Sequence, residues 1–209
     1  MIDKSWFVIN AKLEPVDYEG DSHFRFTKEL ASLVIEKYSK PGDWILDPFV
    51  GFGTTVQVAQ EMNRNAVGFE VHEGRAGFAA KKVTAPSKII NDRVENIDNH
   101  DLPKFDLVFT SPPYTTVRLE DDPQGQTYFE DIRNIFQKIK NHLQPNSTIV
   151  VEVANIKDQH GVRTLAWQIG ELLSSIYKFE GEIIHCSEGS KTGPDSYFDH
   201  SYLLVYKVK

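Results

Sequence analysis

The stretch Asp47-Pro48-Phe49-Val50-Gly51-Phe52-Gly53-Thr54-Thr55 decides the fold of this chain. It completes an apolar run over residues 44–49 that is typical of a buried strand, and its two threonines open a segment of helical character over residues 54–62. Gly51 and Gly53 permit a tight turn and a close approach between the backbone and a ligand. This order predicts a corner made of a strand, a glycine turn and a helix.

The chemistry of this corner favours an amino-acid-like ligand. The free N–H groups at a helix start, here at Thr54 and Thr55, attract an anion such as a carboxylate. Asp47 stands at the strand end, where it is suited to pair with an ammonium group. An ammonium group beside a carboxylate describes an amino acid. A purely structural corner is the alternative at this point, because a lone Gly-x-Gly also occurs in ordinary turns.

Outward from this corner, short apolar runs alternate with helix-like segments. Strands are expected over residues 44–49, 66–70, 88–91, 105–110, 148–154, 180–186 and 201–208. Helices are expected over residues 26–38, 54–62, 74–82, 128–143 and 162–177. The alternation predicts an α/β fold with a mostly parallel seven-stranded sheet and helices on both faces. The last two strands lack an intervening helix, so the final strand is expected to run antiparallel.

Length, charge and cysteine content bound the class of protein. The chain has 209 residues, a net charge of −7 and 1 cysteine. These values predict one domain over residues 1–209 with an irregular lead-in over residues 1–22, and they exclude an internal disulfide. The 7 histidines lack paired-ligand spacing, so no catalytic metal is expected. No apolar run of membrane-spanning length or signal peptide is evident, which makes a cytoplasmic protein the default.

Acidic residues follow two further strands of the predicted sheet. In sheets of this kind, ligands bind beyond the carboxyl ends of the strands. Glu70 suits the two hydroxyls of a ribose, and Asp92 can accept a hydrogen bond from the exocyclic amine of adenine. The third glycine of a dinucleotide fingerprint is missing, which favours a nucleoside over NAD. The alternatives are a surface glutamate at position 70 and a turn-forming aspartate at position 92.

The second chemical motif is Thr110-Ser111-Pro112-Pro113-Tyr114, at the end of another predicted strand. Two prolines remove two N–H donors, so the carbonyls of the strand end are presented as acceptors. Ser111 adds a hydroxyl, and Tyr114 adds an aromatic face on which a planar base can stack. This set suits the exocyclic amino group of a nucleobase. The alternative is a proline-terminated strand with a core tyrosine.

The two motifs in this order resemble the amino-methylating DNA methyltransferases, which use S-adenosylmethionine to methylate cytosine N4 or adenine N6. Residues 23–30, 68–73, 89–92 and 198–207 resemble further segments of that family, so the likeness covers most of the chain. The resemblance implies a catalytic set of Ser111, Pro112, Pro113 and Tyr114. It implies a cofactor-binding set of Phe26, Thr27, Asp47, Pro48, Phe49, Gly51, Gly53, Thr54, Thr55, Glu70 and Asp92.

The expected activity is methyl transfer to the amino group of a flipped DNA base, as in restriction-modification systems. In the family, serine at the start of the proline motif is more usual for cytosine N4 and aspartate for adenine N6, so Ser111 favours cytosine. The alternatives are an RNA base methyltransferase, a protein-amide methyltransferase and a catalytically silent partner subunit.

Two departures from the family concern target recognition. Only residues 115–126 and 187–197 are inserted, and both are interpreted as lips of the pocket. Little room is left for a separate recognition domain, so a partner subunit or homo-oligomer is expected to help. The basic residues, expected on a solvated face, are Arg64, Arg75, Lys81, Lys82, Lys88 and Arg93.

Overall fold

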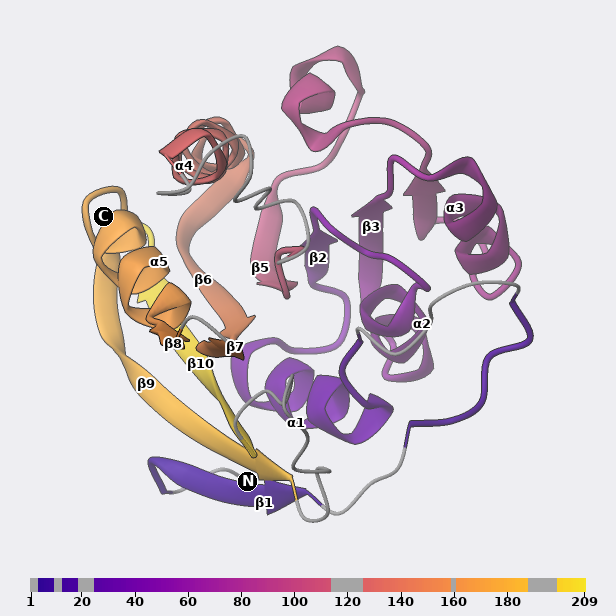
Figure 1. Ribbon diagram of the computed structural model, residues 1–209. Coiled ribbons are helices and arrows are strands. Elements are labelled where there is room, and N and C mark those ends of the chain that lie inside the picture. The colour runs from indigo at the N-terminus through magenta and orange to yellow at the C-terminus, as the bar shows by residue number, and fades with distance from the viewer. Residues whose placement is uncertain (1–3, 10–12, 19–24, 114–125, 159–160, 188–198) are drawn as a thin grey trace.

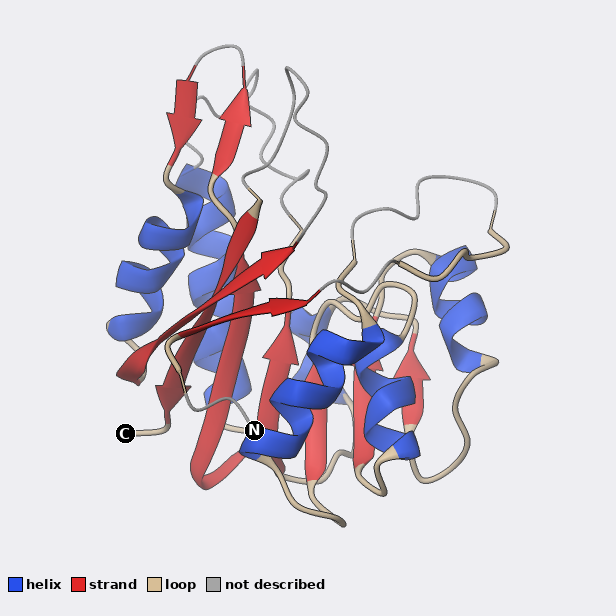
Figure 2. Cartoon of the chain, turned by 90° about the horizontal axis from the view of Figure 1, so that it is seen from below, coloured by secondary structure: helices blue, strands red, loops and turns tan. Residues whose placement is uncertain are grey.

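A computed structural model describes residues 4–9, 13–18, 25–113, 126–158, 161–187 and 199–209. In this part of the chain, one eight-stranded sheet carries helices on both faces (Figures 1 and 2). Its strands are β1 (Trp6–Ile9), β2 (Trp44–Asp47), β3 (Asn65–Phe69), β4 (Lys88–Ile90), β5 (Phe105–Thr110), β6 (Leu143–Val153), β9 (Lys178–Ser187) and β10 (His200–Lys207). A separate hairpin joins β7 (Ile156–Asp158) and β8 (Gly161–Arg163).

The helices divide the core into two parts. They are α1 (Lys28–Tyr38), α2 (Thr54–Glu61), α3 (Glu73–Ala80), η1 (Val94–Asn99, a 3-10 helix), α4 (Gln126–Lys140) and α5 (Leu165–Ser174). One apolar cluster joins α1 and α2 to one face of the sheet, and a second joins η1, α4 and α5 to the other face. No helix in the described ranges is long and apolar enough to cross a membrane.

The strand order is β1-β9-β10-β6-β5-β2-β3-β4. Strands β2 to β6 run parallel, and β10 runs antiparallel to both β6 and β9. From β2 the chain moves outward to β3 and β4, and then crosses back to β5 on the other side of β2. The order of the strands therefore reverses between β2 and β5, which is where open α/β sheets bind their ligands.

The predicted α/β sheet with a final antiparallel strand is confirmed, with one strand more than expected. Residues 1–22 were expected to be irregular, and this is wrong for β1, which pairs in parallel with β9 from Trp6↔Ile184 to Ile9↔Ser187. Four residues are too few for a periodic pattern, and their partner strand lies far along the chain. Helix α5 begins at Leu165 and not at Val162, because residues 161–163 form β8.

Gly68 of β3 gives the first prediction. A Cβ at this position would lie 2.6, 2.7 and 2.8 Å from three side-chain atoms of buried Val50. Since the Val50 Cβ is one of those atoms, a rotamer change cannot relieve the contact. We expect Gly68→Ala to lower the free energy of unfolding by about 2–3 kcal/mol, measured by urea denaturation.

Gly77 of α3 is the matched control, because a Cβ there would meet nothing within 4 Å. Gly77→Ala is expected to raise the free energy of unfolding by about 0.5–1 kcal/mol. Equal stability of the two variants would contradict the packing of Val50 against β3.

Candidate active site

The carboxyl edge of the parallel strands brings four predicted site residues to one side of the sheet. Asp47 ends β2, Glu70 follows β3, Asp92 follows β4 and Ser111 follows β5. These residues come from four segments between positions 47 and 111, and the parallel pairing of β2 to β5 places their strand ends along one edge. The predicted location of the site at this edge agrees with the fold.

The two glycines of the turn have different roles, although the sequence suggested the same role for both. Gly51 has φ +53°, and a Cβ there would meet nothing within 4 Å, so its side of the turn is open. Gly53 has φ +85° and is the N-cap of α2, but a Cβ there would lie 2.9 Å from the Cβ of Ala79 in α3. Gly53 therefore serves the close packing of α3, and of the two glycines Gly51 has the open space that a ligand needs.

Asp47 joins the two motifs directly. Its carboxylate accepts hydrogen bonds from Thr55 Oγ1 at 2.6 Å, Thr110 Oγ1 at 2.7 Å and the Phe49 N–H at 3.1 Å. Thr55 belongs to α2, and Thr110 is the last residue of β5, next to Ser111. Asp47 is only 2% exposed. These contacts give Asp47 a structural role that the sequence did not indicate, at the point where the strand order reverses.

The buried position of Asp47 has an electrostatic consequence. Loss of solvation raises the pKa of Asp47 to about 6, although hydrogen bonds from Thr55, Thr110 and Phe49 act in the opposite direction. Nearby Glu70 adds to the rise. A buried carboxylate lowers the stability of the fold unless several hydrogen-bond donors contact it. The three hydrogen bonds to Asp47 offset the free energy lost by burying it, and they hold the glycine motif against the proline motif.

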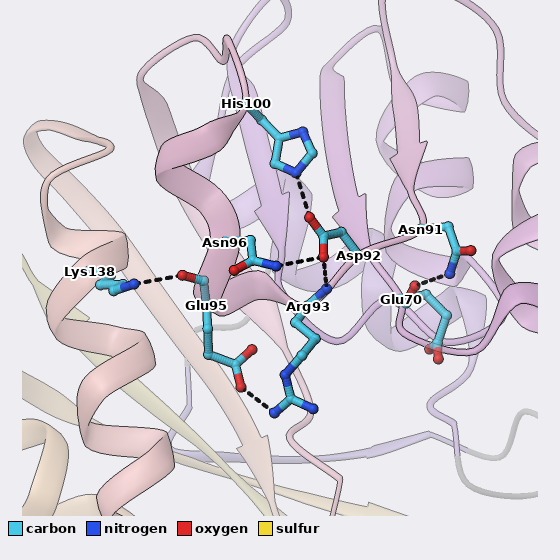
Figure 3. A network of polar contacts seen from close by, with 8 residues as sticks. All are labelled: Glu70, Asn91, Asp92, Arg93, Glu95, Asn96, His100 and Lys138. Atoms are coloured by element: carbon cyan, nitrogen blue, oxygen red, sulfur yellow. Dashed lines mark hydrogen bonds and ion pairs between the residues drawn. The ribbon is translucent and has the colours of Figure 1, made fainter.

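Glu70 is buried, which differs from the surface glutamate considered as an alternative. Its exposed fraction is 7%, its Oε1 accepts from the His72 N–H at 2.8 Å, and Arg75 Nη2 lies 3.1 Å from the same oxygen. Asn91 donates to the Glu70 backbone oxygen at 2.8 Å and so ties the ends of β3 and β4 together (Figure 3). The acid at the end of β3 is thus held in one orientation.

Asp92 lies at the start of a polar network (Figure 3). Hydrogen bonds from Asn96 at 2.8 Å and from the Arg93 N–H at 2.7 Å reach one carboxylate oxygen, and His100 Nε2 lies 3.0 Å from the other. Hydrogen bonds from Asn96, His100 and the Arg93 N–H hold the pKa of Asp92 below its ordinary value. Through its contact with Asn96, Asp92 fixes the start of η1.

The segment before α1 lies against the end of β5. The rings of Phe26 and Phe109 are 4.7 Å apart, and Phe109 is the residue before Thr110. Thr27 is the N-cap of α1, and its hydroxyl accepts from the Leu30 N–H at 3.2 Å. Phe26 is therefore placed beside the proline motif, whereas the observed contact of the Thr27 hydroxyl serves the helix start.

The remaining predicted residues of the glycine motif differ in burial. Pro48 is buried and Phe49 is half-buried against the larger apolar cluster. Thr54 is half-buried at the first turn of α2, where Thr55 is fully buried through its contact with Asp47.

The proline motif reveals a residue that the sequence reasoning missed. Ser111 Oγ donates a hydrogen bond to Glu152 Oε2 at 2.8 Å. Pairing of Thr110 with Val151 brings the end of β5 beside Glu152 of β6. Pro112 is buried and Pro113 is exposed. Tyr114 and most of the two pocket lips, residues 115–125 and 188–197, lie outside the described residues.

Three of the six basic residues are partly buried against neighbouring segments, which corrects the expected solvated face for them. Arg64 donates to the backbone oxygens of Met62 and Ser39, Arg75 pairs with Glu70, and Lys82 donates to the Phe52 backbone oxygen. Among the described residues, no group of three or more His, Cys, Asp or Glu side chains could hold a metal ion.

Comparison with known proteins finds a family similarity in the first part of the chain. A family model of N6 and N4 methylases, described as DNA methylase, matches residues 7–81. Residues 7–81 are thus similar to the DNA methylase family, and we call them the DNA methylase segment. This DNA methylase segment holds the glycine turn, Glu70 and α3, and it ends before the proline motif.

Curated relatives match a stretch of similar length, about a third of the chain. The Type II methyltransferase M.SmaI of Serratia marcescens is 43% identical over 77 residues, which are 36% of this chain and 25% of that protein. The Type II methyltransferase M.MthZI of Methanothermobacter thermautotrophicus is 37% identical over 73 residues, 34% of this chain and 21% of that protein. The matches thus span about a quarter or less of the relatives' length.

Solved structures extend the likeness beyond the DNA methylase segment to the fold of most of the chain. A precorrin-6y C5,15-methyltransferase of Geobacter metallireducens has a TM-score of 0.62 at 15% identity, covering 92% of this chain and 95% of that one. An rRNA methylase of Streptococcus thermophilus has a TM-score of 0.58 at 10% identity, covering 90% and 100%. The chain has the class I methyltransferase fold.

Proposed function

We propose that this chain transfers a methyl group from S-adenosylmethionine to the exocyclic amino group of a flipped DNA base, with cytosine N4 favoured over adenine N6. The observation that carries the proposal is Asp47, whose carboxylate accepts from both Thr55 and Thr110. It holds the glycine turn of the DNA methylase segment against the first residue of the proline motif. Ser111 at the start of the motif supports cytosine.

The described residues fit S-adenosylmethionine as the cofactor. Open space beside Gly51 admits a ligand against the backbone, and the buried carboxylate of Glu70 suits ribose hydroxyls. Asp92 at the end of β4 has the position that suits the adenine amine, and Phe26 lies over the end of β5. Pro48, Phe49, Gly53, Thr54 and Thr55 complete the proposed cofactor-binding set, with Asp47 and Thr27 acting through the backbone that they hold.

The bound cofactor supplies an activated methyl group, so the protein's task is to position the amine for in-line attack. In the proposed arrangement Ser111 Oγ and the Pro112 carbonyl accept hydrogen bonds from the amine. The prolines keep the end of β5 rigid, and Tyr114 stacks on the base, which has left the DNA stack to reach the edge of the sheet.

We also propose one catalytic domain over residues 1–209. The sheet supports this, because its strands begin at Trp6 and end at Lys207. Recognition of the target sequence is assigned to a partner subunit or a second copy. In support, three of the six basic residues considered above, Arg64, Arg75 and Lys82, contact the fold itself.

Identification of the methylated nucleoside tests this function. The protein is incubated with labelled S-adenosylmethionine and mixed-sequence DNA, in duplex and single-stranded form, and the DNA is digested to nucleosides for mass analysis. We expect N4-methylcytosine, because Ser111 stands at the head of the proline motif. N6-methyladenine would keep the enzyme class and change the base. Label in RNA alone, or absence of both methylated bases, would contradict the proposal.

A further inference from the structure

The contact between Ser111 and Glu152 joins the proline motif to a carboxylate that the proposed function does not use. Ser111 Oγ donates to Glu152 Oε2 at 2.8 Å. Both side chains are half-buried, and Glu152 stands between buried Val151 and Val153 on β6. The buried valines lie on the opposite face of the strand, because successive side chains alternate. A half-buried carboxylate loses part of its solvation, which the Ser111 hydroxyl partly replaces. The Glu152 carboxylate therefore lies where it can orient the hydroxyl of the proposed catalytic serine.

A serine hydroxyl presents either a proton or lone pairs, depending on how it is turned. An ionised carboxylate only accepts, so the hydroxyl that donates to Glu152 has its proton directed to β6. Its oxygen then presents lone pairs in other directions. The target amino group carries two hydrogens and needs acceptors to align it. The contact with Glu152 thus selects the orientation of Ser111 that suits an amine.

We propose that Glu152 is a positioning residue for methyl transfer, which turns the Ser111 hydroxyl into an acceptor for the target amine and receives, through Ser111, the proton that the amine loses. This inference rests on the proposed function and adds to it a residue from β6, outside the DNA methylase segment. Ser111 and Glu152 together would then accept from the amine, as a single aspartate at the start of the proline motif would.

The proton balance of the step is complete. The amino nitrogen gains the bond to the methyl carbon, while the S–C bond breaks and its electron pair stays on sulfur. The nitrogen then holds one proton more than the neutral product. That proton passes to Ser111 Oγ as the hydroxyl proton moves to Glu152 Oε2. Glu152 is half-exposed, so the proton can leave to solvent before the next turnover.

A double-mutant cycle tests the proposal in the full chain. Steady-state methylation of DNA is measured for wild type, Glu152→Ala, Glu152→Gln, Ser111→Ala and the Ser111→Ala/Glu152→Ala pair, with cofactor affinity measured by calorimetry. We expect Glu152→Ala to lower kcat by about a hundredfold, within the range of general acid–base effects. Glu152→Gln keeps an acceptor for the hydroxyl but cannot take the proton, so a loss of about tenfold is expected.

Two further readouts separate this role from a structural one. Cofactor affinity of the Glu152 variants should stay within about twofold of wild type, and in the Ser111→Ala background Glu152→Ala should change kcat by less than about twofold, because coupled residues are not additive. Glu182→Gln, at an exposed position on β9, is the matched control and should leave kcat unchanged.

The outcomes are distinguishable. Active wild type with unaffected Glu152 variants, or equal losses from Glu152→Ala in both backgrounds, would overturn this proposal alone. A wild-type protein that methylates no nucleic acid would overturn the proposed function and this inference with it. If Glu152→Ala does not fold, Glu152→Gln carries the test, and a kcat equal to that of wild type would refute the proton-accepting role.

Discussion

Gly51→Leu is expected to weaken binding of S-adenosylmethionine by at least about a hundredfold, because only a backbone without a side chain leaves that space to a ligand. Gly51 has φ +53°, and its open side meets no atom within 4 Å of a Cβ. A leucine there would project into the space where we place the cofactor. Isothermal titration calorimetry measures the loss directly, with no need for a known DNA target.

Gly42 provides a matched control at the other end of β2. It has φ +90°, and a Cβ there would also meet nothing within 4 Å. Both leucine variants incur a backbone cost of about 1–2 kcal/mol from the left-handed conformation. Gly42→Leu should therefore lose similar stability and keep its cofactor affinity. Equal affinities in the two variants would show that the cofactor does not lie against Gly51.

Asp47→Ala is expected to lower the free energy of unfolding by about 2–4 kcal/mol, because three donors lose their buried acceptor. These donors are the Thr55 and Thr110 hydroxyls and the Phe49 N–H. Asp47→Asn should fold well, since its amide oxygen can accept from Thr110 and Phe49 while its amide nitrogen donates to Thr55. Urea denaturation of both variants at pH 7.5 gives the comparison.

The pH dependence of Asp47→Asn isolates the buried charge. Burial raises the pKa of Asp47 to about 6 in the folded chain. The unfolded chain releases this proton near pH 4 and the folded chain near pH 6, so the contribution of Asp47 to stability is full below pH 4 and is lost as the pH rises toward about 6. The whole loss is about 3 kcal/mol.

Asparagine has no such proton. From pH 5 to pH 7.5, Asp47→Asn should therefore gain roughly 1 kcal/mol of unfolding free energy relative to wild type. Other titrating groups are common to both proteins and cancel in the difference. A difference that does not change with pH would show that Asp47 titrates normally, against its burial.

The sequence predicted most of what local pattern controls. Strand β5 has the bounds that were expected, and α1 ends at Tyr38 as expected. The acids at the ends of β3 and β4 reach the same edge as the glycine turn, because parallel strands place their carboxyl ends together. The roles assigned to these residues in cofactor binding and catalysis stay predictions.

Contacts between distant segments could not be predicted. Asp47 and Thr110 are 63 residues apart, and Ser111 and Glu152 are 41 apart. Each contact depends on which strands are neighbours and on their register, and no periodicity within one segment encodes that. Helix packing likewise decided Gly53, whose role depends on Ala79 in another helix. The alternating Val-Glu-Val at 151–153 was the available signal for Glu152.

The pairing of strand β1 shows that the matched residues 7–81 do not form a folding unit by themselves. The matched segment over residues 7–81 includes most of β1, whose partner is β9 at residues 178–187, far beyond the match. In the sheet, β9, β10, β6 and β5 all stand between β1 and β2. A fragment cut at the limits of the similarity would leave β1 without its neighbour and β2 without β5. The shape of residues 7–81 therefore depends on a later stretch of the chain that lies outside the matched residues.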